Sequence, residues 1–152
     1  MDTLEKITTS QWYAEEKLLE TILSGDVDEN DIIQWENSLE KALSEIPADS
    51  SFKCLVNLHG FTAINIEAHK RYRNIIPLTL AKYNWKVGYV DLFEEASQLT
   101  LSKNRNIQCV AAVHVHQDET KITKYEEKFG RDNEHFMTDP DKAKAWILNY
   151  KI

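Results

Sequence analysis

Two short apolar runs constrain the fold of this chain more than any other feature. Phe52–Leu58 reads Phe-Lys-Cys-Leu-Val-Asn-Leu, and Cys109–Val115 reads Cys-Val-Ala-Ala-Val-His-Val. Runs of this length and composition, flanked by helical patterns, are typical of strands buried on both faces of a parallel sheet. The alternation of strands with helical patterns predicts an α/β fold with a mostly parallel sheet.

The segments before and between these runs predict strands and helices in turn. Gln11–Ser24 is expected to form a hairpin or two short strands, and Gly25 should close that segment as a turn does. Asp28 is expected to cap a long amphipathic helix. A helical stretch at about residues 66–84 contains Pro77 and should be kinked or divided there.

The second half of the chain continues the alternation. Gly130 follows a helical pattern, at a position where a left-handed cap is easiest. The predicted elements are a short strand at Val87–Val90, a helix holding Phe93, Ala96 and Leu99, a helix through Ile122, Tyr125 and Phe129, a strand at Glu134–Thr138, and a helix that begins at Asp139-Pro140 and buries Ala143, Trp146, Ile147 and Tyr150. The sheet should therefore carry about four to five helices.

Composition and charge bound the functions that the chain can serve. Its 152 residues fit a single domain, 1–152, and the charges sum to 18 − 25 = −7. That balance argues against nucleic acid and anionic membranes as the main partners. The longest uncharged stretch, Cys54 to Ile66, has 13 residues, too few to span a bilayer. No signal-peptide pattern begins the chain, so we expect a cytoplasmic protein.

The charges are divided unevenly along the chain. Residues 1–50 carry 13 acidic and three basic residues, whereas residues 51–152 carry 12 acidic and 15 basic residues. No linker or low-complexity run separates the two halves. The pattern therefore indicates one domain with an acidic face rather than two domains.

The order of these elements resembles the SpoIIAA-like branch of the STAS fold, the fold of anti-sigma-factor antagonists. The matching pieces cover about residues 12 to 150 and lie in the order and spacing of that family. They are Leu18-Leu19-Glu20-Thr21-Ile22-Leu23-Ser24-Gly25, Leu55-Val56-Asn57-Leu58-His59-Gly60-Phe61, Val110-Ala111-Ala112-Val113-His114-Val115-His116, and Phe136-Met137-Thr138-Asp139 with Ala143 and Trp146 in the closing helix.

The resemblance implies a regulatory docking module that binds a protein partner without catalysis or a cofactor. The family's phosphorylated Ser region would fall on Asn65-Ile66-Glu67, where no hydroxyl is present. Phosphate control of that type is therefore not expected, although Glu67 would supply a fixed negative charge near a helix start. The predicted partner site is the loop and helix start after the central strand, and it comprises His59, Phe61, Thr62, Ile64, Asn65, Glu67 and His69.

A second interpretation is a carrier or sensor of a small apolar, lipid-like ligand. More apolar residues follow position 75 than one helix face needs, and the excess could line a pocket. The SpoIIAA-like branch is also similar in fold to CRAL-TRIO lipid-binding domains. The residues expected to line such a pocket are Ile75, Ile76, Leu78, Tyr89 and Phe93.

A third interpretation is a metal-dependent enzyme at the strand ends. His59, His114 and His116 end the two core strands, where ligands of open α/β sheets bind, but their spacing matches no diagnostic metal motif. Cysteine catalysis is not expected, because Cys54 lies about 16 Å along the strand from His59. The chain is therefore interpreted as non-enzymatic.

Two surface features complete the sequence-based expectations. The segment from His69 to Arg73 is basic and aromatic, and it could hold an anion or an acidic partner, although one such helix turn is usually ordinary exposed surface. Trp12 and Trp35 are expected near an exposed edge, where they would suit a homodimer.

Overall fold

The computed structural model describes residues 6–90 and 99–152, which form a six-stranded, mostly parallel sheet. The strand order is β1-β2-β3-β5-β6, with β4 paired to β2 alone. Among the strands of the described residues, only β1 runs antiparallel to its neighbour, so the predicted α/β class and the N-terminal hairpin are confirmed. The strands are β1 (Ile7–Tyr13), β2 (Leu18–Val27), β3 (Ser51–Asn57), β4 (Phe61–Ala63), β5 (Gln108–Val115) and β6 (Glu134–Met137).

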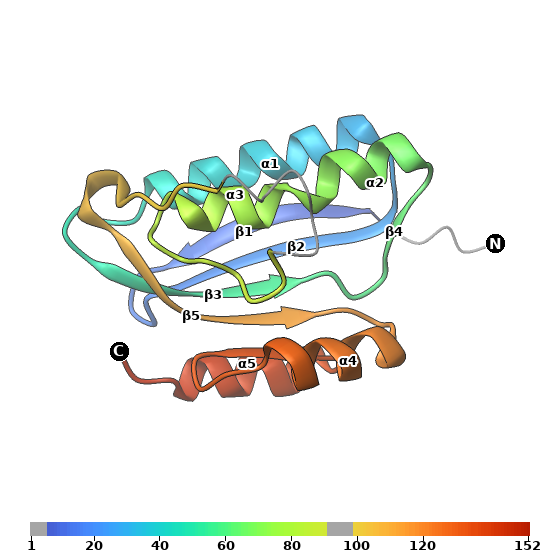
Figure 1. Cartoon of the computed structure of the whole chain (residues 1–152). Helices are drawn as coiled ribbons and strands as arrows, with labels where there is room; N and C mark the ends of the chain where they lie inside the picture. The colour runs from blue at the N-terminus through green and yellow to red at the C-terminus, as the bar shows by residue number, and fades with distance from the viewer. Residues whose placement is uncertain (1–5, 91–98) are drawn as a thin grey trace.

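Helices cover the sheet on both sides. Figure 1 places α1, α2 and α3 above the sheet and α4 and α5 below it. None of the helices in the described ranges is long and apolar enough to cross a membrane. The helices are α1 (Glu29–Ser44), α2 (Ile66–Arg73), α3 (Ile75–Ala81), α4 (Glu119–Phe129) and α5 (Pro140–Asn149), with a 3-10 turn at Asn104–Asn106.

Strand β2 continues beyond the glycine that was expected to end it. Gly25 has a φ of 91°, which a residue without a Cβ adopts without strain, and it lies inside the strand. Up to Ile22 the strand pairs with β3, and from Gly25 to Val27 it pairs with β4. The glycine thus lets one strand pass from one partner to another, and it carries the chain to the end of the sheet where β4 lies.

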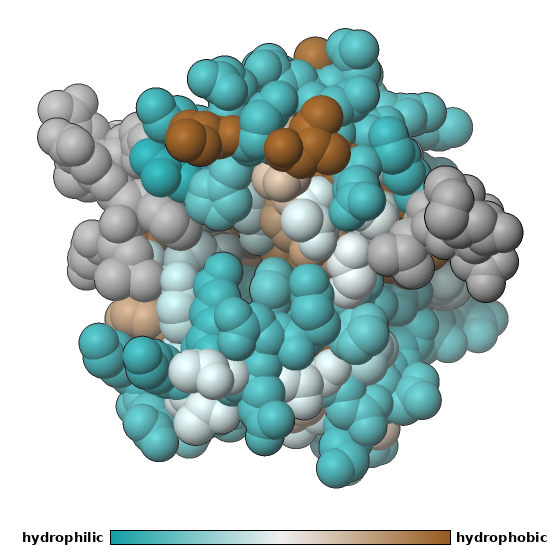
Figure 2. Space-filling view, turned by 90° about the vertical axis from the view of Figure 1, so that its right-hand side faces the viewer, coloured by the Kyte–Doolittle hydropathy of each residue, from teal (hydrophilic) through white to brown (hydrophobic). Residues whose placement is uncertain are grey.

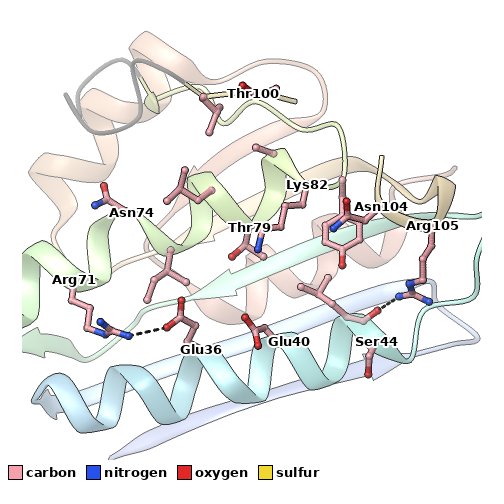
Figure 3. A pocket seen from close by; sticks show the side chains of 16 residues that line it. Glu36, Glu40, Ser44, Arg71, Asn74, Thr79, Lys82, Thr100, Asn104 and Arg105 are labelled. Carbon is pink, nitrogen blue, oxygen red and sulfur yellow. Dashed lines mark hydrogen bonds and ion pairs between the residues drawn. The ribbon is translucent and has the colours of Figure 1, made fainter. Parts of the chain in front are cut away.

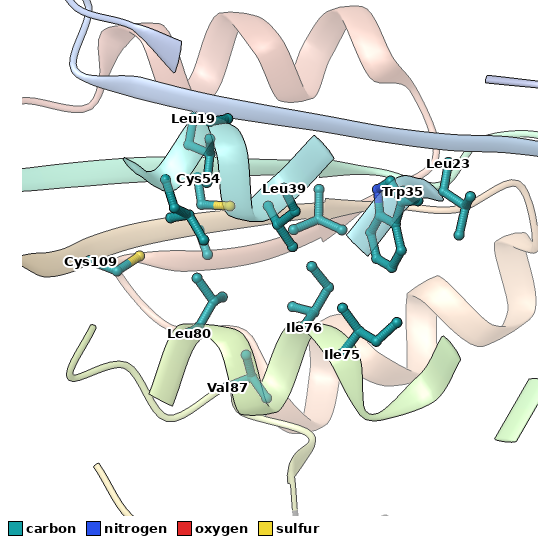
Figure 4. Packing of buried hydrophobic residues seen from close by; sticks show 14 of the residues in the cluster. Leu19, Leu23, Trp35, Leu39, Cys54, Ile75, Ile76, Leu80, Val87 and Cys109 are labelled. Atoms are coloured by element: carbon teal, nitrogen blue, oxygen red, sulfur yellow. The ribbon is translucent and has the colours of Figure 1, made fainter. Parts of the chain in front are cut away.

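The main core lies between the sheet and the layer formed by α1 and α3. Figure 4 shows Trp35 and Leu39 from α1 facing Ile76 and Leu80 from α3. Trp35 is fully buried, and its indole Nε1 donates to Thr21 Oγ1 at 2.7 Å. The expectation that Trp35 lies at an exposed edge is therefore wrong, because α1 turns it inward onto β2.

A second core lies under α5. Ala143 and Ile147 are buried there against Leu55 and Val113, while Trp146 is only partly buried at the margin. The predicted buried face of this helix is therefore correct at its centre. Since β3 and β5 are covered on both faces, their nearly continuous apolar sequences are explained.

The long helical stretch is divided three residues before its proline. Asn74 separates α2 from α3, and Pro77 lies in the first turn of α3. A proline is tolerated there because backbone N–H groups in the first helical turn have no partner within the helix. The predicted division is real, but its position was misplaced because the proline begins a helix instead of interrupting one.

Two local predictions in the second half of the chain are wrong. Val87–Val90 does not form a strand, since Val90 N donates to the Val87 carbonyl at 3.2 Å in a turn. Gly130 ends α4 with φ −61° instead of a left-handed conformation. A glycine is needed there for space, because a Cβ would lie 2.5 Å from the Glu126 carbonyl oxygen. The expected helix positions of Phe93 and Ala96 lie outside the described residues.

The capping of α1 provides a direct test of this fold. Asp28 accepts the Asp31 backbone N–H at 2.8 Å, and the Asp31 side chain accepts the Asp28 N–H at 2.9 Å. We predict that Asp28→Ala lowers the free energy of unfolding by about 1 kcal/mol in a urea titration. Asp28→Asn keeps a side-chain acceptor and should cost less than half as much; equal losses would contradict this role of the cap.

Candidate functional site

The carboxyl ends of the parallel strands form the most developed site among the described residues. Figure 1 shows α2 and α4 beginning at the side to which the arrows of β3 and β5 point. Figure 2 views this side, and a hollow lies near the middle of the face, below exposed apolar side chains. Ligands of open α/β sheets bind at this end, because the loops after the strands meet there.

The hollow has an outer and an inner part. An outer groove of about 500 Å³ lies beside α2, and an inner pocket of about 150 Å³ lies between α2 and α4. The two cavities share side chains and therefore adjoin each other. The shared residues are His69, Tyr72, Arg73, His116 and Lys121.

The loop between β3 and α2 is held in place by polar contacts at its start. Ser24 Oγ donates to the His59 carbonyl at 2.9 Å. Gln117, from the loop after β5, accepts the Gly60 N–H at 2.9 Å and donates to the Phe61 carbonyl at 2.8 Å. Gly60 has a φ of 89°, and a Cβ there would lie 2.6 Å from Ser24 Oγ. The loop is therefore fixed to β2 and to the end of β5.

The side chains predicted to form a docking site differ in their exposure to solvent. Phe61 is buried, and its ring centroid lies 4.3 Å from that of Tyr72. Ile64 and Ile66 are 56% and 67% exposed, which is unusual for side chains of this size. Asn65 caps α2 by accepting the Ala68 N–H at 2.8 Å. The apolar surface of the loop is thus supplied by two isoleucines and not by Phe61.

The other polar members of the predicted docking site lie around the same loop. Glu67 is exposed in the first turn of α2, and Thr62 is exposed in β4. His59 is exposed, and its backbone N–H donates to Asn57 Oδ1 at 3.0 Å. Of the residues predicted for the docking site, Phe61, Thr62, Asn65 and His69 line the outer groove, whereas His59, Ile64 and Glu67 are not part of its lining.

Basic side chains surround the groove although the chain as a whole is acidic. Lys70, Arg73 and Lys121 line it with two histidines, and no Asp or Glu is among the described residues that line either part of the hollow. Burial lowers the pKa of His69, and the nearby charges of Lys121 and Arg73 lower it further. Burial likewise lowers the pKa of Lys121, against the opposing effect of Asp118. The hollow thus concentrates positive charge.

The inner pocket is walled by aromatic rings. Tyr89 and Tyr125 have ring centroids 5.7 Å apart, and both pack against Phe136 at about 6 Å. His114 stacks on Phe136 at 4.7 Å with an interplanar angle of 14°. Burial raises the pKa of both tyrosines, so their hydroxyls stay protonated at neutral pH.

A buried carboxylate holds the floor of this pocket. Glu134 is fully buried, and its Oε2 accepts a hydrogen bond from His114 Nε2 at 2.8 Å. Its Oε1 accepts from the Gly88 N–H at 2.9 Å and from Arg131 Nε at 3.1 Å. Burial would raise the pKa of the carboxyl, but His114 and Arg131 outweigh it, and the pKa is lowered. The carboxylate therefore fixes the His114 ring and the turn before Tyr89 together.

The three histidines of the metal interpretation serve different structural roles. His114 is paired with Glu134, and His116 Nδ1 accepts the Asp118 N–H at 3.1 Å. Because a backbone N–H only donates, the proton of His116 must lie on Nε2 in this arrangement. Within the described ranges, no three His, Cys, Asp or Glu side chains are grouped so that they could hold a metal ion.

The two cysteines are remote from this chemistry. Cys54 and Cys109 are both buried in the main core, and burial raises the pKa of the Cys54 thiol to about 12. A thiol in such surroundings stays protonated at neutral pH and is a poor nucleophile. Both residues therefore serve as small buried hydrophobes of the main core.

The residues expected to line an apolar ligand pocket are not brought together. Ile76 is buried in the core, Tyr89 lines the inner strand-end pocket, and Phe93 lies outside the described residues. Ile75 and Leu78 line a separate groove of about 750 Å³ between α1 and α3.

That separate groove has polar and charged walls (Figure 3). Glu36 and Glu40 lie on its α1 side, and Arg71 pairs with Glu36 at 3.2 Å. Arg105 donates to the carbonyls of Leu43 and Ile46 at 2.8 Å, near the end of α1. A lining of this kind does not favour a lipid-like ligand.

Comparisons with protein-family models, curated proteins and solved structures find no match to this chain. The likeness to the SpoIIAA-like STAS branch therefore stays a prediction from the sequence.

Sequence reasoning missed two contributors to the site. Lys121 was not singled out, since nothing in its sequence neighbourhood shows that α4 places it opposite His69 and Arg73 of α2. Ile66 was considered only as a residue lacking a hydroxyl. The sequence did contain a signal for its exposure. Ile64 and Ile66 flank Asn65, the residue that caps α2, and a helix start in a polar segment does not require buried apolar side chains at these positions.

The buried pair of Glu134 and His114 gives a prediction for stability and its pH dependence. We predict that Glu134→Gln lowers the free energy of unfolding by about 3 kcal/mol at neutral pH, because Arg131 and His114 lose a buried charged partner. The exposed control Glu127→Gln should change it by less than about 0.5 kcal/mol.

The pH dependence has a definite sign. Since the folded-state pKa of Glu134 is lowered, its ionisation stabilises the fold above the unfolded-state value of about 4.3. This contribution is lost as the pH falls through the lower, folded-state pKa. Urea titrations between about pH 6 and about pH 3 should show that the free energy of unfolding falls more steeply with decreasing pH for the wild type than for Glu134→Gln. Parallel curves would contradict the assignment.

Proposed function

We propose that this protein is a non-catalytic docking module that binds an acidic, apolar segment of a protein partner at the face formed by the loop 59–69 and α2. The observation that carries the proposal is the exposure of Ile64 and Ile66 beside a groove lined by cations. We call this surface the docking face, and it comprises Ile64, Ile66, His69, Lys70, Arg73 and Lys121.

The apolar part of the docking face supports contact with another macromolecule. Ile66 and Ile64 lie one on each side of the helix cap Asn65, and both are more than half exposed. Exposed apolar side chains of this size that are rimmed by polar groups are characteristic of binding surfaces. Covering them would remove apolar area from water, which is the main favourable contribution to association.

Charge complementarity selects the kind of partner. Lys70, Arg73 and Lys121 line the groove in a chain whose net charge is −7. The basic face attracts acidic segments, and the acidic remainder of the surface repels them, so such segments are directed to this one place. The partner chemistry that fits is therefore a segment in which apolar residues alternate with Asp or Glu.

The fixed position of the loop also supports docking. Gln117 and Ser24 hold the loop to two strands, so little conformational entropy remains to be lost when a partner binds. The apolar-carrier and metal interpretations have less support, because the residues predicted for each of them lie apart or are engaged in other contacts.

We predict that the docking face binds short peptides in which Leu alternates with Glu, and not those in which Leu alternates with Lys or Ser. Fluorescence anisotropy with labelled peptides measures the affinity. Ile66→Ser should weaken binding about tenfold, through lost apolar contact. Lys70→Glu should weaken it several-fold, and more strongly at low salt.

Matched control variants lie elsewhere on the molecule. Leu148→Ser changes an exposed apolar residue of α5, and Lys151→Glu reverses a charge near the C-terminus. Both should leave peptide binding unchanged. Equal binding of the Lys and Glu peptides, or equal losses for the control and docking-face variants, would overturn the proposal.

A further inference from the structure

Strand β1 forms one edge of the sheet, and its outer side is open among the described residues. The strand order places β2 on one side of β1 and no strand on the other. Within residues 6–90 and 99–152, none of the backbone hydrogen bonds in turns and loops involves a residue of β1. Because the backbone groups of an edge strand point alternately toward and away from its one neighbour, about half of those of β1 lack a partner strand.

Edge strands usually carry a feature that prevents pairing with another chain, such as a charge, a proline, a bulge or a very short length. Strand β1 has seven residues, and they include neither a charged side chain nor a proline. All seven pair with β2 in unbroken register, from Ile7 opposite Ser24 to Tyr13 opposite Leu18, so the strand contains no bulge. It can therefore serve along its whole length as a template for another strand.

The opposite edge of the sheet is not available in this way. Strand β6 has four residues, and its Phe136 N–H donates to Glu126 Oε1 of α4 at 2.9 Å. Strand β4 has only three residues, and its Phe61 carbonyl accepts Gln117 Nε2 at 2.8 Å. Among the described strands, β1 is thus the one long open edge, and pairing of two chains through it stops at two copies.

The middle of β1 is held in place by its neighbours. Ser10 Oγ lies 2.8 Å from Thr21 Oγ1 of β2 and 3.0 Å from Ser38 Oγ of α1. Ser10 therefore faces α1, and since side chains alternate along a strand, Thr9 and Gln11 face the other side, where both are exposed. Uncharged polar side chains flank the centre of the edge, and little order remains to be imposed on the strand when it pairs.

The charges around β1 do not oppose a second copy of this chain. The first fifty residues contain only three basic residues, and all three lie around this strand. Lys6 precedes β1, Lys17 lies in the turn after it, and Lys41 is one helical turn beyond Ser38, which contacts β1. Lys6 Nζ contacts Asp31 at 2.9 Å. The negative charge of this half of the chain is thus partly offset along β1.

The two ends of β1 carry charges of opposite sign. The Lys6 side chain is 47% exposed at one end, whereas Glu15 and Glu16 follow the strand in an exposed turn. In an antiparallel pair of two β1 strands centred on Ser10, the basic end of each copy lies beside the acidic end of the other. Opposite charges across paired strands are favourable, and like charges directly opposite each other are not. This charge pattern fits a second copy in the antiparallel orientation.

We propose that two copies of this chain associate through their β1 strands, which pair antiparallel about Ser10 and join the two sheets into one. The occupant of the open edge is thus a second copy of the chain itself. None of the residues of the docking face belongs to β1, so this dimer does not rest on the docking of a partner segment.

Sedimentation velocity of the full chain over a concentration series tests this proposal. The mass should rise with concentration from that of one chain to that of two, and no further. Thr9→Lys places two like charges about 7 to 8 Å apart across the pair and should weaken dimerisation at least about tenfold. The control Thr120→Lys adds the same charge at an exposed position of α4 and should leave dimerisation unchanged.

A mixture of oppositely charged variants tests whether the partner is a second copy. Thr9→Glu should weaken dimerisation as Thr9→Lys does, but an equimolar mixture of the two variants should recover dimers, because opposite charges then lie across the pair. Circular dichroism of each variant establishes that the fold is intact. In the wild type, amide hydrogen exchange of Ile7–Tyr13 should slow as the concentration rises, whereas exchange in β6 should not change.

Several results would overturn the proposal. A wild type that stays monomeric at every concentration would leave the open edge to an extended segment of another protein. Undiminished dimers in Thr9→Lys, or a mixture of the two charged variants that stays monomeric, would place the interface elsewhere. Assemblies larger than two chains would contradict the closure of the opposite edge. Ile66→Ser should weaken peptide binding and leave dimerisation unchanged, so the two proposals fail separately.

Discussion

The geometry of the strand-end site depends on one buried ion, the carboxylate of Glu134. A charge with no exposure to water is tolerated only when its hydrogen-bonding positions are filled. His114, Arg131 and the Gly88 N–H fill them, and each comes from a different segment. The turn that presents Tyr89, the ring at the pocket floor and the end of α4 are therefore positioned by the same two oxygens.

The fold places charges together that are far apart in the sequence. The first fifty residues carry all of the excess negative charge, and the parallel strands bring the basic segment after β3 to the same end as α4. Lys121 and Arg73, which are 48 residues apart in the sequence, then line one hollow. Net charge alone predicts the repulsion of anions, whereas the local field at this hollow attracts them, since the field in a cleft depends on its own lining.

The parts of this fold that follow from local patterns could be predicted from the sequence. The apolar runs of β3 and β5, the cap at Asp28 and the Asp139-Pro140 helix start depend on a few neighbouring residues. The turn at Val87–Val90 could not be predicted, because its conformation is fixed by a carboxylate more than forty residues away. The burial of Trp35 and the position of Lys121 likewise depend on how helices face their neighbours, which periodicity does not specify.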